Sequence, residues 1–286
     1  MPRPGEKSVQ PYTREDQQLD TFNRQARAAF ADVYRQLEAQ NRYGSRIMPA
    51  DAYTALWWPL DDAAYLPTPT AFRNQGINRG SADMLTLGPG ALMSPTGGLL
   101  APACLRLNGA ASTNRWATGA PGMDLGQPPH CTISAWVRLG TSANNQIIAG
   151  YMTPGGVSVG AGVLYRGADG LLRCEVISAA GSRTAVMTGD VPFTDSQWHH
   201  VWSYYDGVEV GVGVDGIAAS SGPFAYSPLN WAGATPAWFV GGISGSTNNA
   251  IGLVQDVRVL TVPRKADWGD EVWRRGRALF ATEARL

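Results

Sequence analysis

The chain has few charged residues and almost no lysine. Charged residues make up 16% of its 286 positions, against roughly a quarter in an average soluble protein. The only lysines are Lys7 and Lys265, and 23 basic residues balance 23 acidic ones, so the formal net charge is zero. Nucleic acids and anionic membrane surfaces attract proteins through excess positive charge. Both are therefore excluded as primary partners.

Long apolar runs and paired cysteines are missing as well. No apolar stretch approaches the roughly 18 residues of a membrane-spanning helix, and the polar N-terminal sequence predicts that the protein is not exported by a signal peptide. Three cysteines, Cys104, Cys131 and Cys174, are widely separated, and none belongs to a CxxC pair. They predict three buried, reduced thiols rather than a disulfide framework or a zinc site.

Residues 1–50 are the first of two predicted parts, an extended arm followed by an amphipathic helix. Apolar residues recur there at intervals of three and four, which places them on one helix face; they are Leu19, Phe22, Ala26, Phe30, Val33 and Leu37. This stripe packs either on the C-terminal part of the chain or on further copies or a partner protein. The second is favoured because a helix outside a β domain has little else to bury, which makes 1–50 an anchor or oligomerisation segment.

Residues 51–286 are the second predicted part, in which short β-branched and aromatic runs alternate with turn residues. Asp206-Gly207, Asp215-Gly216 and the segment 167–170 are signals of tight turns. A short closing helix is expected over 266–279. The pattern predicts a mainly β fold, a two-sheet antiparallel sandwich, with strands at 52–60, 104–107, 132–138, 157–165, 171–177, 198–205, 208–214, 237–240 and 253–260.

Alternation within the run 198–205 separates two rows of side chains. Trp198, His200 and Trp202 share one side of the strand, whereas Val201 and Tyr205 share the other. One row must enter the core between the sheets. Because aromatic side chains fill such cores with a large area per residue, we expect the tryptophans to belong mainly to that core.

Several of these strands resemble a known family in the order in which they occur. CTISAWV at 131–137 is similar to the FTISAWV strand of laminin G-like, concanavalin A-like jelly-roll domains, and WHHVWSYYDG at 198–207 is similar to their WHHVAxTYDG hairpin. VGVGVDG at 210–216 and GLVQDVRVL at 252–260 match two later strands. The resemblance covers roughly residues 52–275. It implies a jelly-roll sandwich and a binding or structural module, often for glycans or proteins.

One departure from the family bears on metal binding. The closing strand of the family usually carries Asp followed by Glu, and here Gln255 and Asp256 occupy those positions. Loss of one carboxylate weakens the case for calcium, because this cation needs several oxygen ligands. We expect no cofactor; calcium at Asp61 and Asp62 is the weak alternative.

Catalytic residues are not evident. A glycoside hydrolase needs two carboxylates across the scissile bond, yet Glu175 stands alone on its candidate strand and Glu209 has hydrophobic neighbours. His199 and His200 are adjacent, so they face opposite ways, and His130 is isolated. We therefore expect no enzymatic activity.

Glycan-binding candidates lie mainly in the expected loops. Sugars stack on exposed aromatic rings, and amides beside the ring bond their hydroxyl groups. The residues of these types are Trp231, Asn144, Asn145, Tyr151, Asn248 and Asn249. Each also has a simpler interpretation, since asparagine is a common turn former and Trp231 can fold over the sandwich.

Taken together, these patterns favour a non-enzymatic bacteriophage virion protein, assembled in the host cytoplasm as a homo-oligomer. Residues 1–50 would join it to other virion proteins, and the sandwich would decorate the capsid or contact a host-surface glycan. Capsid, tail-fibre, collar and baseplate roles are not distinguished by the sequence. The alternative is a bacterial glycan-binding module, and a weaker one is a polysaccharide-degrading enzyme.

Overall fold

The computed structural model divides the chain into two compact units, Met1–Arg46 and Ile47–Leu286. The predicted arm and its apolar stripe lie outside the described residues, as do Asp61, Asp62 and Trp231. No described helix is long and apolar enough to cross a membrane. The structure describes residues 51–60, 71–73, 76, 84–87, 92–94, 98–99, 104–108, 117–119, 128–152, 158–178, 181–187, 197–223, 225–229, 237–242 and 247–283.

In the described part of the second unit, two antiparallel sheets of eight strands each face one another. Sheet A runs in the order β14 (Ile217–Ser220), β13 (Val210–Val214), β12 (His199–Tyr205), β7 (Cys131–Leu139), β16 (Ile251–Leu260), β5 (Cys104–Asn108) and β4 (Leu92–Ser94), and β1 (Thr54–Trp58) also pairs with β16. Sheet B runs in the order β11 (Gly181–Val186), β10 (Leu172–Ser178), β9 (Ser158–Arg166), β8 (Gln146–Met152), β15 (Ala237–Val240), β6 (Ala117–Gly119), β3 (Met84–Leu87) and β2 (Ala71–Arg73).

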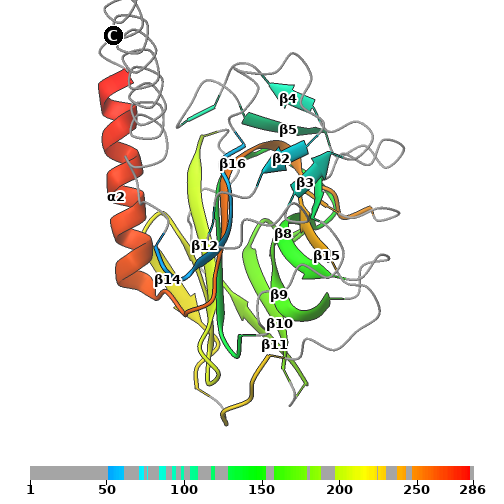
Figure 1. Cartoon of the computed structure of the whole chain (residues 1–286), viewed down its shortest axis with the longest axis vertical. Coiled ribbons are helices and arrows are strands. Elements are labelled where there is room, and N and C mark those ends of the chain that lie inside the picture. Colours follow the sequence, from blue (N-terminus) through cyan, green and yellow to red (C-terminus); the bar gives the residue numbers. More distant parts are fainter. Residues whose placement is uncertain are drawn as a thin grey trace, which may run out of the picture. The chain divides into compact units, whose positions relative to one another are not determined.

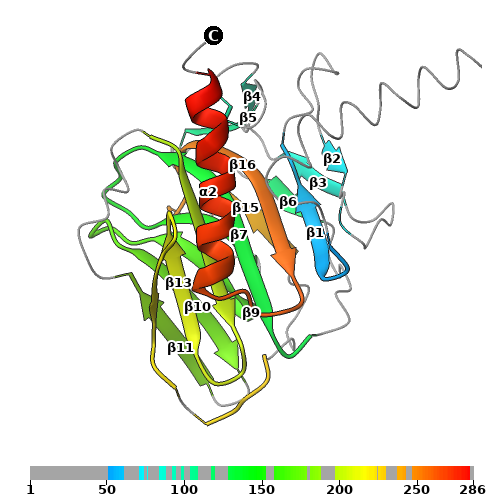
Figure 2. The same cartoon turned by 90° about the vertical axis from the view of Figure 1, so that its left-hand side faces the viewer.

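The second unit has three layers, with one helix outside the sandwich. Figure 1 shows helix α2 (Ala266–Glu283) on one side, sheet A in the middle and sheet B on the other side. Seen from the helix side, α2 runs along the outer face of sheet A (Figure 2). Sheet A is therefore covered on both faces, by sheet B and by its own C-terminal helix.

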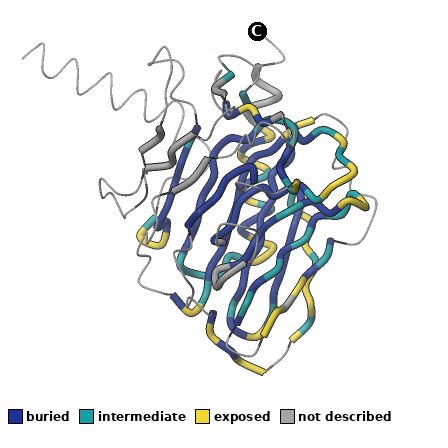
Figure 3. The backbone as a smooth tube through the Cα atoms, turned by 90° about the vertical axis from the view of Figure 1, so that its right-hand side faces the viewer, coloured by how far each residue is buried: buried dark blue, intermediate teal, exposed yellow. Residues whose placement is uncertain are grey.

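The main core fills the space between the two sheets. On β7, Ile133, Ala135 and Val137 point into it, and they are at most 1% exposed. Buried stretches run through the central strands, whereas the exposed positions concentrate at turns and edges (Figure 3). The three cysteines are buried and free, as the sequence predicts. Burial raises the pKa of the Cys104 thiol to about 11, which keeps it protonated.

A second aromatic core lies on the outer face of sheet A, beneath α2. Trp136, Trp198 and Trp202 pack there with Trp268 and Val272 of the helix. The expectation that the tryptophan row of β12 fills the space between the sheets is therefore wrong, because Val201 and Tyr205 occupy that space. Alternation correctly separates the two rows, but it does not identify the inner one, since the helix buries the outer row equally well.

Two glycines of α2 bring the helix onto this aromatic surface. A Cβ on Gly269 would overlap the Trp202 ring, and a Cβ on Gly276 would overlap the Trp136 ring. The two glycines are seven residues apart, which places them on the same face of the helix two turns apart. Their missing side chains let the helix backbone rest directly on the two indole rings.

A bulge in β16 marks the place where its partner strand changes. Residues before it pair with β5 and residues after it pair with β1. Asp256 lies in the bulge with φ 53°, a conformation unfavourable for most residues but tolerated by Asp. Its Oδ1 accepts a hydrogen bond from the Trp57 indole at 2.5 Å, and Arg258 donates to both carboxylate oxygens at 3.1 Å. Asp256 thus links β16 to Trp57 of β1, and the side chain of Gln255 links β16 to the backbone of Leu99.

The predicted fold class is confirmed, and each of the nine candidate strands overlaps an observed one. The closing helix is also present and extends to Glu283. Strands β2, β3, β4, β6, β8, β11 and β14 were not among the candidates. Two of them carry little apolar alternation, since β11 is GSRTAV and β14 is IAAS; pairing with stronger neighbours creates these strands, and local sequence does not predict that.

Candidate functional site

Three connecting segments meet at one end of the sandwich. They are the loop 140–145 between β7 and β8, the turn 167–170 between β9 and β10, and the segment 247–250 that leads into β16; we call them the asparagine rim. Asn145 Oδ1 accepts a hydrogen bond from the backbone of Ala168 at 3.0 Å. The Ile147 backbone donates to the Asn248 carbonyl at 3.1 Å. The two asparagine clusters of the sequence therefore lie around one strand end.

Gln146 holds this rim together from beneath. Its side chain is fully buried, its Nε2 donates to the Gly140 carbonyl at 2.8 Å, and its Oε1 accepts from the Ile251 backbone at 2.7 Å. A further backbone bond joins Gly140 to Ile251 at 2.8 Å. One buried amide thus links a strand of sheet B to the segments that flank two sheet A strands. The parts of the rim are therefore connected to one another by hydrogen bonds.

The predicted glycan-binding residues fall into two groups. Asn144 is exposed, and Asn145 and Asn248 are half-buried, all on the rim. Tyr151 is 6% exposed and packs on Trp238 in the main core, with ring centroids 5.3 Å apart. Asn249 is 1% exposed. The structure therefore brings three of the asparagines together at the surface, whereas the side chains of Tyr151 and Asn249 are buried.

A cluster of charged side chains surrounds the turn at 167–170. Arg173 forms a bidentate ion pair with Asp169. The hydrogen bonds from Arg173 lower the pKa of the Asp169 carboxyl to about 2, so it is ionised at neutral pH. Arg166, at the end of β9, is 5% exposed, and its Nε and Nη1 atoms are buried without a hydrogen-bond partner.

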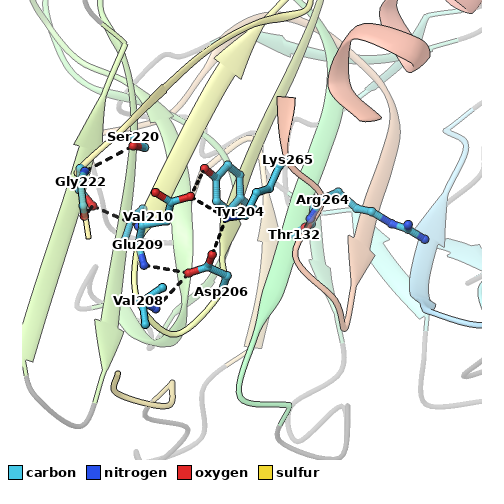
Figure 4. A network of polar contacts seen from close by, with 11 residues as sticks. Thr132, Tyr204, Asp206, Val208, Glu209, Val210, Ser220, Gly222, Arg264 and Lys265 are labelled. Atoms are coloured by element: carbon cyan, nitrogen blue, oxygen red, sulfur yellow. Dashed lines mark hydrogen bonds and ion pairs between the residues drawn. The ribbon is translucent and has the colours of Figure 1, made fainter. Parts of the chain in front are cut away.

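The structure places two carboxylates side by side at a different position, the β12–β13 turn (Figure 4). Lys265 Nζ lies 2.8 Å from Asp206 Oδ2 and 2.9 Å from Glu209 Oε1, and Tyr204 OH donates to Glu209 at 2.7 Å. The expectation that Glu209 has only hydrophobic neighbours is therefore wrong. The pairing was not evident because Lys265 is distant in the sequence and joins the turn only when α2 docks.

This carboxylate pair is a poor match for glycoside hydrolysis. Hydrogen bonds from Lys265 and then from Tyr204 lower the pKa of Glu209. Burial alone would raise the pKa of Asp206, but hydrogen bonds from Lys265 and from the turn backbone lower it overall. Acid catalysis of glycosidic cleavage needs one carboxyl with a raised pKa that carries the proton. Both groups here are ionised, and the lysine between them occupies the space of a substrate.

His199 and His200 both lie in structural surroundings. His199 Nδ1 lies 2.6 Å from Asp215 Oδ2. His200 lies among Trp136, Trp202 and Trp268, with ring centroids within 5.9 Å. Burial, followed by the positive charge of Arg258, lowers the pKa of His200 to about 3. Within the described residues, no three His, Cys, Asp or Glu side chains are placed to hold a metal ion.

Sequence reasoning missed the two residues that organise the rim, Gln146 and Arg166. Both lie at strand ends beside turn signals, Gln146 after Asn144-Asn145 and Arg166 before the turn at 167–170. A polar side chain at an inward-facing position of a strand is the only local signal for either residue. The hydrogen-bond partners of Gln146 come from β16 and from the β7–β8 loop, and these segments become neighbours only in the folded sandwich.

Comparison with solved structures finds the same fold in binding domains. The binding domain of Paraclostridial Mosquitocidal Protein 1 aligns with a TM-score of 0.55 at 12% identity, covering 80% of this chain and 52% of that one. The ligand binding domain of botulinum neurotoxin serotype D, in complex with N-acetylneuraminic acid, aligns at 0.53 and 9% identity, covering 78% and 50%. The chain spans about half the length of these two structures.

An enzyme shares the fold as well. A sialidase of Trypanosoma rangeli aligns with a TM-score of 0.54 at 12% identity, covering 80% of this chain and 33% of the sialidase. At these identities the similarity establishes the fold alone. No curated protein sequence matches the chain. The family model for the concanavalin A-like lectin/glucanases superfamily, Laminin_G_3, matches residues 112–268. This match covers more than half of the chain, which therefore belongs to the concanavalin A-like lectin/glucanases superfamily.

Proposed function

We propose that the chain is a non-enzymatic, glycan-binding module of a bacteriophage virion and that it binds its glycan at the asparagine rim. The observation that carries this proposal is that Asn144, Asn145 and Asn248 lie at one strand end, on segments that Gln146 connects through hydrogen bonds to Gly140 and Ile251. Amide side chains on a surface with a buried support are suited to bonding sugar hydroxyls, because the support limits the freedom lost on binding.

The fold neighbours support a binding role in the same sense. Two are named as binding domains, and one of these was solved with N-acetylneuraminic acid. Their titles describe those proteins, and the likeness to this chain is one of fold, so the ligand class is our extension. Hydrolysis is the less favoured function, because Lys265 bridges the carboxylates of Asp206 and Glu209.

A glycan array tests the binding function directly. We expect the full chain to bind at least one glycan and Asn144→Ala to weaken that binding about tenfold, the effect of losing one or two hydrogen bonds to a ligand. Trp231→Ala tests whether that residue supplies the stacking ring. Ser220→Ala, at an exposed position of β14, is the matched control and should bind normally. An array with no bound glycan, or unchanged binding by Asn144→Ala, contradicts the proposal.

The virion role rests on the predicted anchor at 1–50 and is tested separately. We expect light scattering to show an oligomer for the full chain and a monomer for a chain that begins at Asp51, because the apolar stripe of the predicted helix needs a partner. If the full chain is also a monomer, self-assembly through residues 1–50 is wrong. The bacterial glycan-binding module then becomes the better description.

A further inference from the structure

Arg166 is a buried cation with an incomplete set of partners. The residue is 5% exposed, and its Nε and Nη1 atoms are buried and have no hydrogen-bond partner among the described residues. A guanidinium stays charged at every pH at which the protein is folded, and an isolated buried charge is costly. Most buried polar groups are paired, so the structure indicates a missing acceptor at this position.

The turn beside Arg166 contains more positive than negative charge. Arg173 engages both oxygens of Asp169, and its guanidinium lies so close over Gly167 that a Cβ there would overlap it. Arg166 reaches the same turn at Gly170, where a Cβ would stand 3.4 Å from Nη2. Asp169 attracts Arg166 by its charge but forms no hydrogen bond with it. Two guanidinium groups therefore share one carboxylate, which leaves one positive charge unbalanced.

Arg166 also lies within the asparagine rim. It is the register partner of Gln146 on the neighbouring strand β8, and Asn145 bonds the Ala168 backbone of the adjacent turn at 3.0 Å. The amide of Asn145 uses its oxygen for that bond, so its nitrogen keeps two donors that no described group accepts. Hydrogen-bond donors and one unbalanced cation are thus combined at the same strand end.

We propose that Arg166 binds the carboxylate of an acidic sugar, so that the rim selects glycans with a negatively charged residue. This inference rests on the proposed glycan-binding function and adds the class of ligand. A carboxylate brings the single negative charge that the turn lacks and a planar pair of oxygens, the geometry that a guanidinium bonds most strongly. The neighbouring asparagines then bond hydroxyl groups of the same sugar.

Two ligands that differ only in charge provide the first test. N-acetylneuraminic acid and its methyl ester have the same ring and hydroxyl groups, but the ester has no negative charge. We expect the full chain to bind the acid at least about tenfold more tightly than the ester, the effect of a charge-assisted hydrogen bond in a water-poor site. Titration followed by the NMR signals of arginine Nε–H groups gives both dissociation constants and shows which arginine responds.

Two variants that remove the same charge provide the second test. Arg166→Gln should bind the acid no better than the ester. Arg166→Lys keeps the charge without the planar guanidinium, so its preference for the acid should be smaller than that of the natural chain and larger than that of Arg166→Gln. Arg106→Gln removes an exposed arginine of β5 in sheet A and should leave the preference for the acid unchanged. Thermal unfolding of each variant establishes that it is folded before binding is measured.

The outcomes separate this inference from the function on which it rests. Preference for the acid that disappears in Arg166→Gln and persists in Arg106→Gln supports the assignment. Equal binding of acid and ester, or full preference in folded Arg166→Gln, overturns the role of Arg166 and leaves glycan binding standing when neutral sugars bind. If no glycan binds, acidic or neutral, both the inference and the proposed function are wrong.

Discussion

The outer face of sheet A and the asparagine rim both carry residue types suited to sugar binding, but they differ in whether these residues are exposed. The sheet face carries Trp136, Trp198 and Trp202, the ring type on which sugars stack, yet α2 buries all three to 8% exposure or less. The rim has amides and a charged turn, and several of its side chains reach solvent. Aromatic content alone therefore does not locate the binding surface, because the chain's own helix already occupies the aromatic face.

Gly276→Ala should produce the largest change in stability, because it pushes α2 away from the aromatic face. At an exposed helix position this exchange stabilises a protein by about 1 kcal/mol. Here the added methyl group overlaps the buried Trp136 ring, so we expect a loss of about 3 kcal/mol in the free energy of unfolding. Urea denaturation measures it. Arg277→Ala, one residue further on and exposed, should change stability by less than about 0.5 kcal/mol; a stabilised Gly276→Ala contradicts the close packing.

Acid should weaken the covered face through His200. Its pKa is about 3 in the folded protein and 6.5 when unperturbed. Below pH 6.5, His200 therefore binds a proton in the unfolded chain but not in the folded chain. Its contribution to stability is fully present above pH 6.5, falls by about 1.4 kcal/mol per pH unit, and is lost as the pH approaches 3. By pH 5 this amounts to about 2 kcal/mol.

The replacement His200→Phe isolates that contribution, because it keeps an aromatic ring beside Trp202 and removes the titrating group. Urea denaturation at pH 7, 6 and 5 should show a shallower pH dependence for the variant than for the natural chain. Ser220→Ala, at an exposed position of β14, removes no titrating group and should retain the natural slope. Parallel curves for the natural chain and His200→Phe would mean that the histidine titrates normally and is less enclosed than the structure shows.

Lys265→Ala should have a smaller effect, since it removes the ion pairs at the start of α2 but no packing. The ammonium bridges Asp206 and Glu209, but it is 52% exposed, so solvent screening limits the loss to about 1 kcal/mol. The difference should shrink in about 0.5 M salt, which screens exposed charges. Arg274→Ala, which removes an exposed i,i+4 pair on the same helix, is the comparison and should cost less. A salt-independent loss would indicate that Lys265 acts through packing.

Asn144→Ala should have the smallest effect on stability and a clear effect on binding. The side chain is exposed, and among the described residues the hydrogen bond of Asn144 is made by its backbone, which donates to Ser142 Oγ at 3.1 Å. We expect a change of less than about 0.5 kcal/mol in unfolding free energy, together with the loss of glycan affinity described above. A large loss of stability with unchanged affinity would instead make the rim a structural feature.

The sequence was sufficient for the fold and only partly sufficient for the site. Alternation in β7 and the Asp-Gly turns specify strands and hairpins locally, so both can be predicted from short stretches of sequence. The direction of the β12 tryptophans was not readable, because it depends on where α2 docks. Arg166 and Gln146 were missed for the same reason: their significance comes from strands distant in the sequence. Tyr151 looked like a loop aromatic, but pairing of β8 with β15 places it against Trp238.

The most direct test of the account is a map of glycan contacts on the folded chain. Backbone amide and tryptophan indole NMR signals would be followed while a bound glycan from the array is added. We predict shifts in 140–146, 166–170 and 247–251, and unchanged indole signals for Trp136 and Trp202 beneath α2. Shifts of those two indole signals without shifts in the rim would mean that the ligand binds the face of sheet A beneath α2. That result would contradict the assignment of binding to the asparagine rim.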